Sequence, residues 1–213
     1  MIPIGDDNTA SRSFPFVTYL FIAINAAVFF MQTQGGEAFT RQWAYIPREF
    51  LSNPGDEAVT LISSMFMHGG IAHILGNMVY LWTFGDNIED RLGHFGYVLF
   101  YIGTGLAAIL AQTAFNPGSN IPNVGASGAI AGVLGAYILL FPQGKVRLLT
   151  QAGIVYLPAI AAIGFWFLLQ FTGILGSLSQ KADTGGVAYM AHIGGFVAGF
   201  AVALLFGRRA PIQ

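Results

Sequence analysis

Residues 127–141 read SGAIAGVLGAYILLF, an unbroken apolar run with no charged residue. As a helix it would be about 22 Å long, which is short of the roughly 30 Å hydrocarbon core of a bilayer. The preceding segment, Asn116–Ala126 (NPGSNIPNVGA), is also uncharged, so we expect it to dip below the outer membrane surface to meet the helix. Irregular backbone at that depth is tolerated only inside protein or beside water. The two segments together therefore predict a buried, hydrated pocket.

The composition indicates a membrane protein. Of the 213 residues, 54% are hydrophobic and only 9% are charged, whereas a soluble domain carries about 25% charged residues. Six stretches are, wholly or nearly, long and apolar enough to span a bilayer: Phe14–Gln32, Ile71–Gly85, Phe95–Phe115, Ser127–Phe141, Gly153–Leu175 and Val187–Phe206. We therefore expect an all-α, polytopic membrane protein, with six transmembrane helices in a single domain over residues 1–213.

The positive charges predict how the helices are oriented, because Lys and Arg accumulate in cytoplasmic loops. With both termini in the cytoplasm, six of the nine positive residues lie inside: Arg12, Arg91, Lys145, Arg147, Arg208 and Arg209. The other three lie outside: Arg41, Arg48 and Lys181. Residues 1–13 and 207–213 are then cytoplasmic segments, and 33–70 is the first outer loop. Because the chain is compact and no targeting signal is visible, we expect a multi-pass protein of a prokaryotic plasma membrane.

Several classes of function are disfavoured. A net charge of −1 without a basic tract provides no surface for nucleic acid. The absence of cysteine excludes disulfides, thiolate metal sites and a cysteine nucleophile. His68, His73 and His192 could suggest a metal, but the spacing of the first two is unsuitable for chelation on a helix and no carboxylate joins them. We expect no metal and no cofactor, and the sequence does not indicate an oligomeric state.

Four polar side chains within the predicted spans point to chemistry, because buried polar groups in a membrane are costly and tend to be functional. His73 and Asn77 begin the second span, Ser127 opens the fourth, and His192 lies in the first turns of the sixth. These three spans run in the same direction, so the four residues lie at a similar depth. A serine hydroxyl becomes a nucleophile when a nearby base such as histidine takes its proton. The pattern predicts acyl transfer, with Ser127 as nucleophile and His192 as general base.

The surroundings of Ser127 fit this chemistry. Its small neighbours allow the backbone and a substrate to approach closely; they are Gly125, Ala126 and Gly128. Ser127 also begins a helix, where free amides and the helix dipole stabilise an oxyanion. His73 and Asn77, four residues apart on one helical face, would complete an oxyanion hole. No Asp or Glu lies in the last three spans, so the catalytic unit would be a Ser–His dyad.

Two ridges of small residues predict that the fourth and sixth spans pack closely. Small residues at every fourth position let helices approach at short range in lipid. One ridge is formed by Gly128, Gly132 and Ala136, and the other by Ala191, Gly195 and Gly199. This packing would bring Ser127 and His192 within hydrogen-bonding distance.

At these positions the sequence resembles the rhomboid family of intramembrane serine proteases. Three segments carry the resemblance: MHGGIAHILGN (Met67–Asn77), GASG (Gly125–Gly128) and AHIGGFVAG (Ala191–Gly199). Two others, FGDNIEDRLG (Phe84–Gly93) and WAYIPREF (Trp43–Phe50), are also similar to family segments. GxSG alone is a weak signal, but its combination with the histidine segments in this order is specific. The resemblance covers nearly the whole chain and implies a rhomboid-like six-helix bundle.

The resemblance also implies roles and a substrate. Ser127 would be the nucleophile and His192 the general base, and the oxyanion hole would consist of His73, Asn77 and the Ser127 amide. A transmembrane protein substrate would enter sideways from the lipid bilayer, past a gate near Gly173–Gly186. It would be cut near the outer face, within or beside its transmembrane segment.

This chain departs from the family pattern in two places. Many members carry a Trp–Arg pair in the first outer loop, and none is found here. Many also have an aromatic residue four positions after the serine, where this chain has Ala131. The second departure bears on how His192 is held.

Other interpretations stay open. Ser127 could serve helix packing, and His73 and Asn77 could simply tie the second span to the outer loop. The residues 86–91 at the inner end of that span are interpreted as a cap and ion-pair cluster, whereas the role of His68 is undecided. For the whole protein, the alternative to an endopeptidase is a non-catalytic rhomboid-like protein that binds membrane segments. A small transporter would require paired intramembrane charges or inverted repeats, and neither is present.

Overall fold

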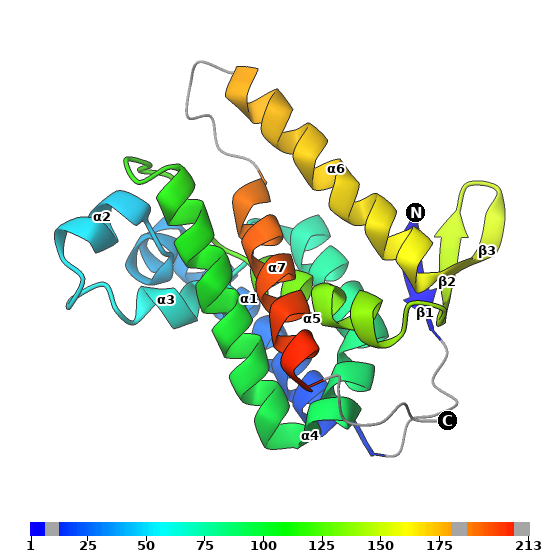
Figure 1. Cartoon of the computed structure of the whole chain (residues 1–213). Coiled ribbons are helices and arrows are strands. Elements are labelled where there is room, and N and C mark those ends of the chain that lie inside the picture. Colours follow the sequence, from blue (N-terminus) through cyan, green and yellow to red (C-terminus); the bar gives the residue numbers. More distant parts are fainter. Residues whose placement is uncertain (7–12, 180–186, 207–213) are drawn as a thin grey trace.

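The computed structural model describes residues 1–6, 13–179 and 187–206, and most of them are helical (Figure 1). The elements in chain order are β1 (Ile2–Gly5), α1 (Phe16–Trp43), α2 (Pro47–Ser52), α3 (Thr60–Ser63), the 3₁₀ helix η1 (Ser64–Phe66), α4 (Ile71–Phe115), α5 (Ser127–Leu140), β2 (Lys145–Thr150), β3 (Gly153–Pro158), α6 (Ala159–Ser179) and α7 (Tyr189–Phe206). Parts of the predicted N-terminal segment and of the predicted gate, and all of the C-terminal tail, lie outside the described residues, as do Arg12, Lys181, Arg208 and Arg209.

Two helices in the described part of the chain are both long enough and apolar enough to cross a bilayer, α1 and α4. A straight helix of the 45 residues of α4 would be about 68 Å long. Instead the chain reverses direction at Gly93, whose backbone angles (φ 70°, ψ 161°) are not helical (Figure 1). Glycine adopts this positive φ without a steric penalty. The turn divides α4 into two arms, residues 71–92 and 94–115.

The predicted C-terminal boundaries of the first two spans are wrong in the same way, whereas the third span, Phe95–Phe115, agrees with the second arm of α4. The helices continue past Gln32 and Gly85, where the apolar runs end. Loss of apolar character marks the edge of a membrane, but it does not end a hydrogen-bonded helix whose residues still favour helical geometry. The actual breaks are at glycines with positive φ, Gly36 and Gly93. The rest of the predicted first outer loop is folded, as expected, into α2, α3 and η1.

The short helix α5 forms the centre of the bundle. Its residues 128–137 are all buried, and α4 and α7 pack against it. A helix that is apolar on every side is typical of a bundle core. Its 14 residues are therefore stabilised by neighbouring helices on all sides.

The predicted ridges of small residues between α5 and α7 are confirmed. A Cβ atom at Gly195 would overlap the carbonyl oxygen of Gly128, and one at Gly199 would overlap that of Gly132. A Cβ atom at Gly135 would in turn overlap the backbone of Phe196. The two helices thus touch backbone to backbone, which fixes how the residues at their N-terminal ends face each other.

A three-stranded antiparallel sheet in the order β1–β2–β3 makes the all-α prediction wrong in this region (Figure 1). The fifth span was expected to begin at Gly153, but residues 153–158 form β3 and the helix begins at Ala159. Side chains along β3 alternate between half-buried and exposed, which is the period of a strand. On the neighbouring strand, Val146 and Leu148 face the core. The alternation of half-buried and exposed side chains along residues 153–158 therefore indicates a strand, although the overall apolar content of the segment favoured a membrane-spanning helix.

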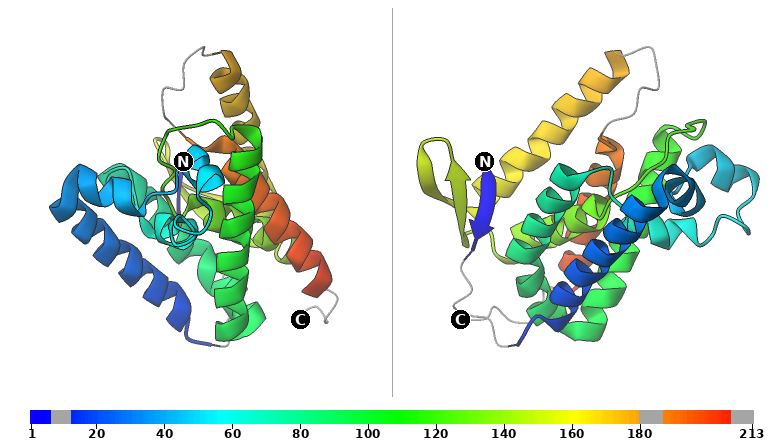
Figure 2. Two further views of the ribbon diagram at one scale, coloured as in Figure 1. Left: turned by 90° about the vertical axis from the view of Figure 1, so that its left-hand side faces the viewer. Right: turned by 180° about the vertical axis from the view of Figure 1, so that it is seen from behind.

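The helix α6 packs on the bundle with few of its side chains. Over residues 159–175 its buried side chains are Ala159, Ile163 and Gln170. The C-terminal end of α6 projects beyond the other helices in all views (Figures 1 and 2). Large apolar side chains such as Phe165 and Leu168 are exposed, as expected for a helix that faces lipid.

Candidate functional site

Ser127 is held at the first position of α5 by the loop that precedes it. The amide of Gly125 donates to the carbonyl of Ser64 (2.9 Å), and the amide of Asn123 donates to the carbonyl of Tyr45 (2.7 Å). The loop is therefore attached to the segment that connects α1 and α4. This attachment sets the position at which α5 begins, and with it the position of the serine side chain.

The structure brings Ser127 and His192 together. The Ser127 Oγ and His192 Nε2 atoms are 2.8 Å apart, a hydrogen-bonding distance. His192 lies in the first turns of α7 and is only 9% exposed. The contact follows from the close packing of α5 and α7, because both residues lie at the N-terminal ends of helices whose backbones touch.

A third side chain, which the sequence analysis missed, completes this arrangement. Gln170 of α6 is buried, and its Oε1 lies 2.8 Å from His192 Nδ1. The rings of Trp166 and Tyr189 flank the same imidazole, with centroids 5.7 and 6.5 Å from it. The sequence prediction of a dyad rested on the absence of Asp and Glu from the last three spans, and a glutamine was not among the expected partners of His192. The available signal was a lone amide side chain in an otherwise lipid-like helix.

His73 and Asn77 lie one turn apart on α4 and differ in their hydrogen bonding. His73 Nδ1 accepts a hydrogen bond from the amide of Gly69 (3.2 Å), which leaves its Nε2 as the protonated nitrogen. Asn77 is buried, and its Nδ2 has no partner among the residues that the structure describes. A buried, unsatisfied amide donor is costly. Asn77 thus presents a donor that the described residues do not use, and His73 presents its Nε2–H as a second donor.

The small residues around Ser127 are required by close contacts. A Cβ atom at Gly125 would lie 3.0 Å from two ring atoms of His73 and 3.5 Å from Ser127 Oγ. Gly125 also has a φ of 136°, which favours glycine. A Cβ atom at Gly128 would lie 2.6 Å from the Cβ of Ala108, and Ala126 is fully buried. Because Gly125 has no side chain, only its backbone lies between Ser127 Oγ and the His73 ring.

A cavity of about 40 Å³ lies beside Ser127. Its lining includes three polar side chains from different segments, Ser64, Gln112 and Asn123, together with Gly125 and Ser127. The space is large enough for water. Its location agrees with the predicted pocket where the loop meets α5.

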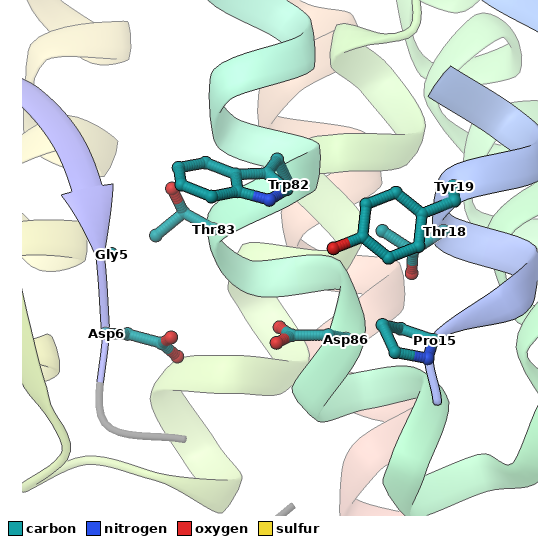
Figure 3. A pocket seen from close by; sticks show the side chains of 8 residues that line it. All are labelled: Gly5, Asp6, Pro15, Thr18, Tyr19, Trp82, Thr83 and Asp86. Carbon is teal, nitrogen blue, oxygen red and sulfur yellow. The ribbon is translucent and has the colours of Figure 1, made fainter. Parts of the chain in front are cut away.

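A larger cavity of about 180 Å³ lies elsewhere, between the N-terminal strand, α1 and α4 (Figure 3). The side chains of Asp6 and Asp86 point toward one another across it (Figure 3). One Asp6 oxygen accepts hydrogen bonds from Asn87 Nδ2 (2.6 Å) and the Tyr137 hydroxyl (2.7 Å). Residues 82–86 lie between about one and a half and three and a half turns along α4 from Asn77 and His73, and none of the residues lining this cavity lines the one beside Ser127. This cavity is therefore not part of the Ser127 site.

Glu89, about one turn along α4 from Asp86, is fully buried, and its carboxylate is saturated with hydrogen bonds. Its carboxylate accepts from the amides of Val17 (2.8 Å) and Thr18 (2.7 Å) and from the Thr18 hydroxyl (2.7 Å). His94 Nδ1 lies 2.6 Å from its Oε1. The first amides of a helix need such acceptors, and α1 has no side-chain cap of its own. The interpretation of this cluster as a cap is confirmed for Glu89.

His68 packs against the site without ligating anything. Its ring lies edge-on to that of His73 (centroids 5.1 Å apart), and neither ring nitrogen has a hydrogen-bond partner in the described part of the chain. Burial, with a smaller contribution from His73, lowers the pKa of His68 to about 4. Among residues 1–6, 13–179 and 187–206, no group of three or more His, Asp or Glu side chains is arranged to hold a metal ion.

The apolar helices, two of them long enough to span a bilayer, define a helical membrane protein, and a serine and a histidine are in contact between two of its closely packed helices. The family model described as "Rhomboid domain" matches residues 55–209. This chain belongs to the rhomboid family.

Named relatives agree with this assignment. Rhomboid protease GluP of Bacillus subtilis is 31% identical over 196 residues, 91% of this chain and 35% of that protein. Rhomboid protein 1, mitochondrial, of Saccharomyces cerevisiae is 27% identical over 188 residues, 86% of this chain and 51% of that protein. RHOMBOID-like protein 4 of Arabidopsis thaliana is 35% identical over 147 residues, 68% of this chain and 33% of that protein. This chain thus spans between about a third and a half of these relatives' length.

The relatives also bear on location. They include a bacterial, a mitochondrial and a plant protein, so they identify a membrane-protein family but do not support the expected prokaryotic plasma membrane.

Proposed function

We propose that this chain is an intramembrane serine endopeptidase that hydrolyses peptide bonds in or near transmembrane segments of other membrane proteins. The observation that carries the proposal is the 2.8 Å contact between Ser127 Oγ and His192 Nε2. A buried serine–histidine pair between packed helices is the arrangement that activates a hydroxyl for nucleophilic attack, and the family includes a named protease.

In the acylation step, Ser127 Oγ attacks the carbonyl carbon of the scissile peptide bond while His192 Nε2 takes the hydroxyl proton. The tetrahedral intermediate then collapses. The carbon–nitrogen bond breaks, and His192 returns the proton to the leaving amine. The acyl part of the substrate, on the N-terminal side of the broken bond, stays on Ser127 as an ester.

Three donors are proposed to stabilise the negative oxygen of the intermediate. They are the Ser127 amide at the N-terminus of α5, the Asn77 side-chain amide and the Nε2–H of His73. A helix N-terminus favours a developing oxyanion, and the unpartnered Asn77 Nδ2 would gain its hydrogen bond only when the oxyanion forms. Such donors stabilise the transition state more than the substrate.

Deacylation needs water inside the membrane. The cavity beside Ser127 has room for it, and His192 would deprotonate the water as it attacks the ester carbonyl. The carboxylic acid product leaves, and the serine hydroxyl is restored with the proton from His192.

The proposed topology has six spans: α1, the two arms of α4, α5, α6 and α7. Each arm of α4 is about 33 Å long, which matches the hydrocarbon core. The distribution of Lys and Arg favours both termini in the cytoplasm. The Ser127 site then lies below the outer surface, and a transmembrane substrate reaches it laterally through the bilayer.

The test is covalent labelling together with cleavage. Purified protein is treated with a fluorophosphonate probe, and cleavage of a single-span substrate is followed in reconstituted vesicles. The wild type and the control Ser52→Ala, a change on exposed α2, should label and cleave, whereas Ser127→Ala and His192→Ala should do neither. Cleavage by Ser127→Ala contradicts the assigned nucleophile. A folded wild type that neither labels nor cleaves favours the non-catalytic, segment-binding alternative.

A further inference from the structure

Gln170 has an unusual position for a polar residue. It lies on α6, whose other buried side chains over residues 159–175 are Ala159 and Ile163, while large apolar side chains of the same helix are exposed. A polar group within a membrane segment is costly unless it is paired, and such groups tend to serve function. Among the described residues, the Gln170 side chain forms hydrogen bonds with His192 and with the backbone of Trp166.

The two hydrogen bonds of Gln170 fix which way its amide points. The Nε2 atom lies 2.8 Å from the carbonyl oxygen of Trp166, and a carbonyl can only accept. The Oε1 atom must therefore face His192 Nδ1 at 2.8 Å. Because an amide oxygen is also only an acceptor, Nδ1 carries the proton. His192 Nε2 is then left with its lone pair toward the Ser127 hydroxyl.

We propose that Gln170 is a positioning residue that fixes the orientation and the tautomer of His192, a role that an aspartate fills in a Ser–His–Asp triad. The inference rests on the proposed function, because the tautomer matters only if His192 acts as a base. It also accounts for Ala131, where family members often have an aromatic residue. Here His192 is held from α6, by Gln170 and by the ring of Trp166.

Because α6 buries so few side chains, Gln170 links the orientation of His192 to the position of α6. Any displacement of α6 that separates Gln170 Oε1 from His192 Nδ1 leaves the imidazole free to rotate and to exchange tautomers. The dyad is therefore fully competent only while α6 is packed against α7.

The test compares Gln170→Leu with Gln170→Glu. The leucine removes the acceptor, and we expect the rate of Ser127 phosphonylation at neutral pH to fall roughly 10- to 100-fold, as for other groups that orient a functional imidazole. The glutamate keeps the length and the acceptor, so activity should return to within severalfold of the wild type. A carboxylate beside Nδ1–H also stabilises the imidazolium, so the acid limb of the pH–rate profile should move to higher pH. Thr172→Val, an exposed change on the same helix, should leave rate and profile unchanged.

A spectroscopic measurement reports the tautomer directly. The chain has only four histidines, so ¹⁵N-histidine labelling resolves each imidazole. The wild type should show His192 protonated at Nδ1, and Gln170→Leu should show a mixture of tautomers.

The outcomes separate this inference from the proposed function. Gln170→Leu that labels at the wild-type rate, or leucine and glutamate variants that slow labelling equally with unmoved acid limbs, overturns the positioning role while the endopeptidase stands. If Gln170→Leu does not fold, the test is the pH–rate profile of Gln170→Glu. An acid limb that moves to higher pH supports the positioning role of Gln170, and an acid limb at the wild-type pH overturns it. An inert wild type removes both proposals.

Discussion

Two polar groups on the first arm of α4, Glu89 and Asn77, differ in how completely they are hydrogen bonded. The carboxylate of Glu89 accepts from two α1 amides and a hydroxyl and contacts His94. Near Ser127, Asn77 Nδ2 and the ring nitrogens of the neighbouring His68 have no partner among the described residues. The contrast is between these side chains and not between whole ends of the bundle, because Thr83 Oγ1 and the Tyr97 hydroxyl, on the Glu89 side, also lack a partner in the described part of the chain.

This difference in hydrogen bonding distinguishes polar groups that stabilise the fold from polar groups that are available for a ligand or a transition state. An unsatisfied buried donor costs about 1–3 kcal/mol, so stability alone would favour its replacement by an apolar group. Such a donor is useful where a ligand or a transition state supplies the missing partner. We therefore expect a change at Glu89 to affect folding, and changes around Ser127 to affect activity more than folding.

The largest expected effect is that of Glu89→Leu on stability. The change leaves the amides of Val17 and Thr18 and the Thr18 hydroxyl without their acceptor, which costs at least about 3 kcal/mol in the free energy of unfolding. We expect a fall in Tm of roughly 10 °C in detergent, measured by differential scanning fluorimetry. Glu37→Leu, which removes an exposed carboxylate from α1, should leave Tm nearly unchanged. A Glu89→Leu protein as stable as the wild type would contradict the capping role.

The next largest effect is expected at Asn77, where a substitution should lower activity and leave stability unchanged. Asn77→Ala removes a donor that the folded protein does not use, so Tm should stay the same or rise slightly. If the amide stabilises the oxyanion, substrate cleavage should slow roughly 10- to 1000-fold. Asn53→Ala, at an exposed position directly after α2, serves as the control for both Tm and substrate cleavage. A stable Asn77→Ala protein with full activity removes Asn77 from the oxyanion hole, and outright unfolding assigns it a structural role.

The sequence was most informative where a short pattern determines geometry. The ridges Gly128–Gly132 and Gly195–Gly199 predict close approach of two helices, because only glycine leaves room for backbone contact. Once those helices touch, Ser127 and His192 at their ends must be neighbours. The loop before α5 was predicted to meet a pocket for a similar reason, the shortness of the helix that follows it.

The sequence was least informative where a partner comes from a distant segment. Nothing local to Gln170 indicates that it faces His192, since the contact depends on how α6 lies across α7. The strand β3 was missed because an apolar run suits both a strand and a span, and its pairing with β2 decides the outcome. The prediction of breaks at Gln32 and Gly85 failed because hydropathy reports the environment of a helix and not its length.

The smallest expected effect concerns His68, which lies before α4, outside the spans. Burial lowers the pKa of His68 to about 4 in the folded protein, compared with 6.5 for an exposed histidine. Between these two values the unfolded chain binds a proton that the folded chain does not. The free energy of unfolding should therefore fall as pH decreases from about 6.5 to about 4, and it should level off below.

Replacing His68 tests whether this group contributes to the pH dependence of the free energy of unfolding. His68→Phe keeps a ring of similar size without a titrating nitrogen, so the decline of Tm between pH 6.5 and 4 should become shallower. The phenylalanine also removes two unsatisfied nitrogens, so Tm near neutral pH should not fall. An unchanged slope would assign the acid sensitivity to other groups. A large loss of Tm at neutral pH would mean that the ring nitrogens of His68 stabilise the fold.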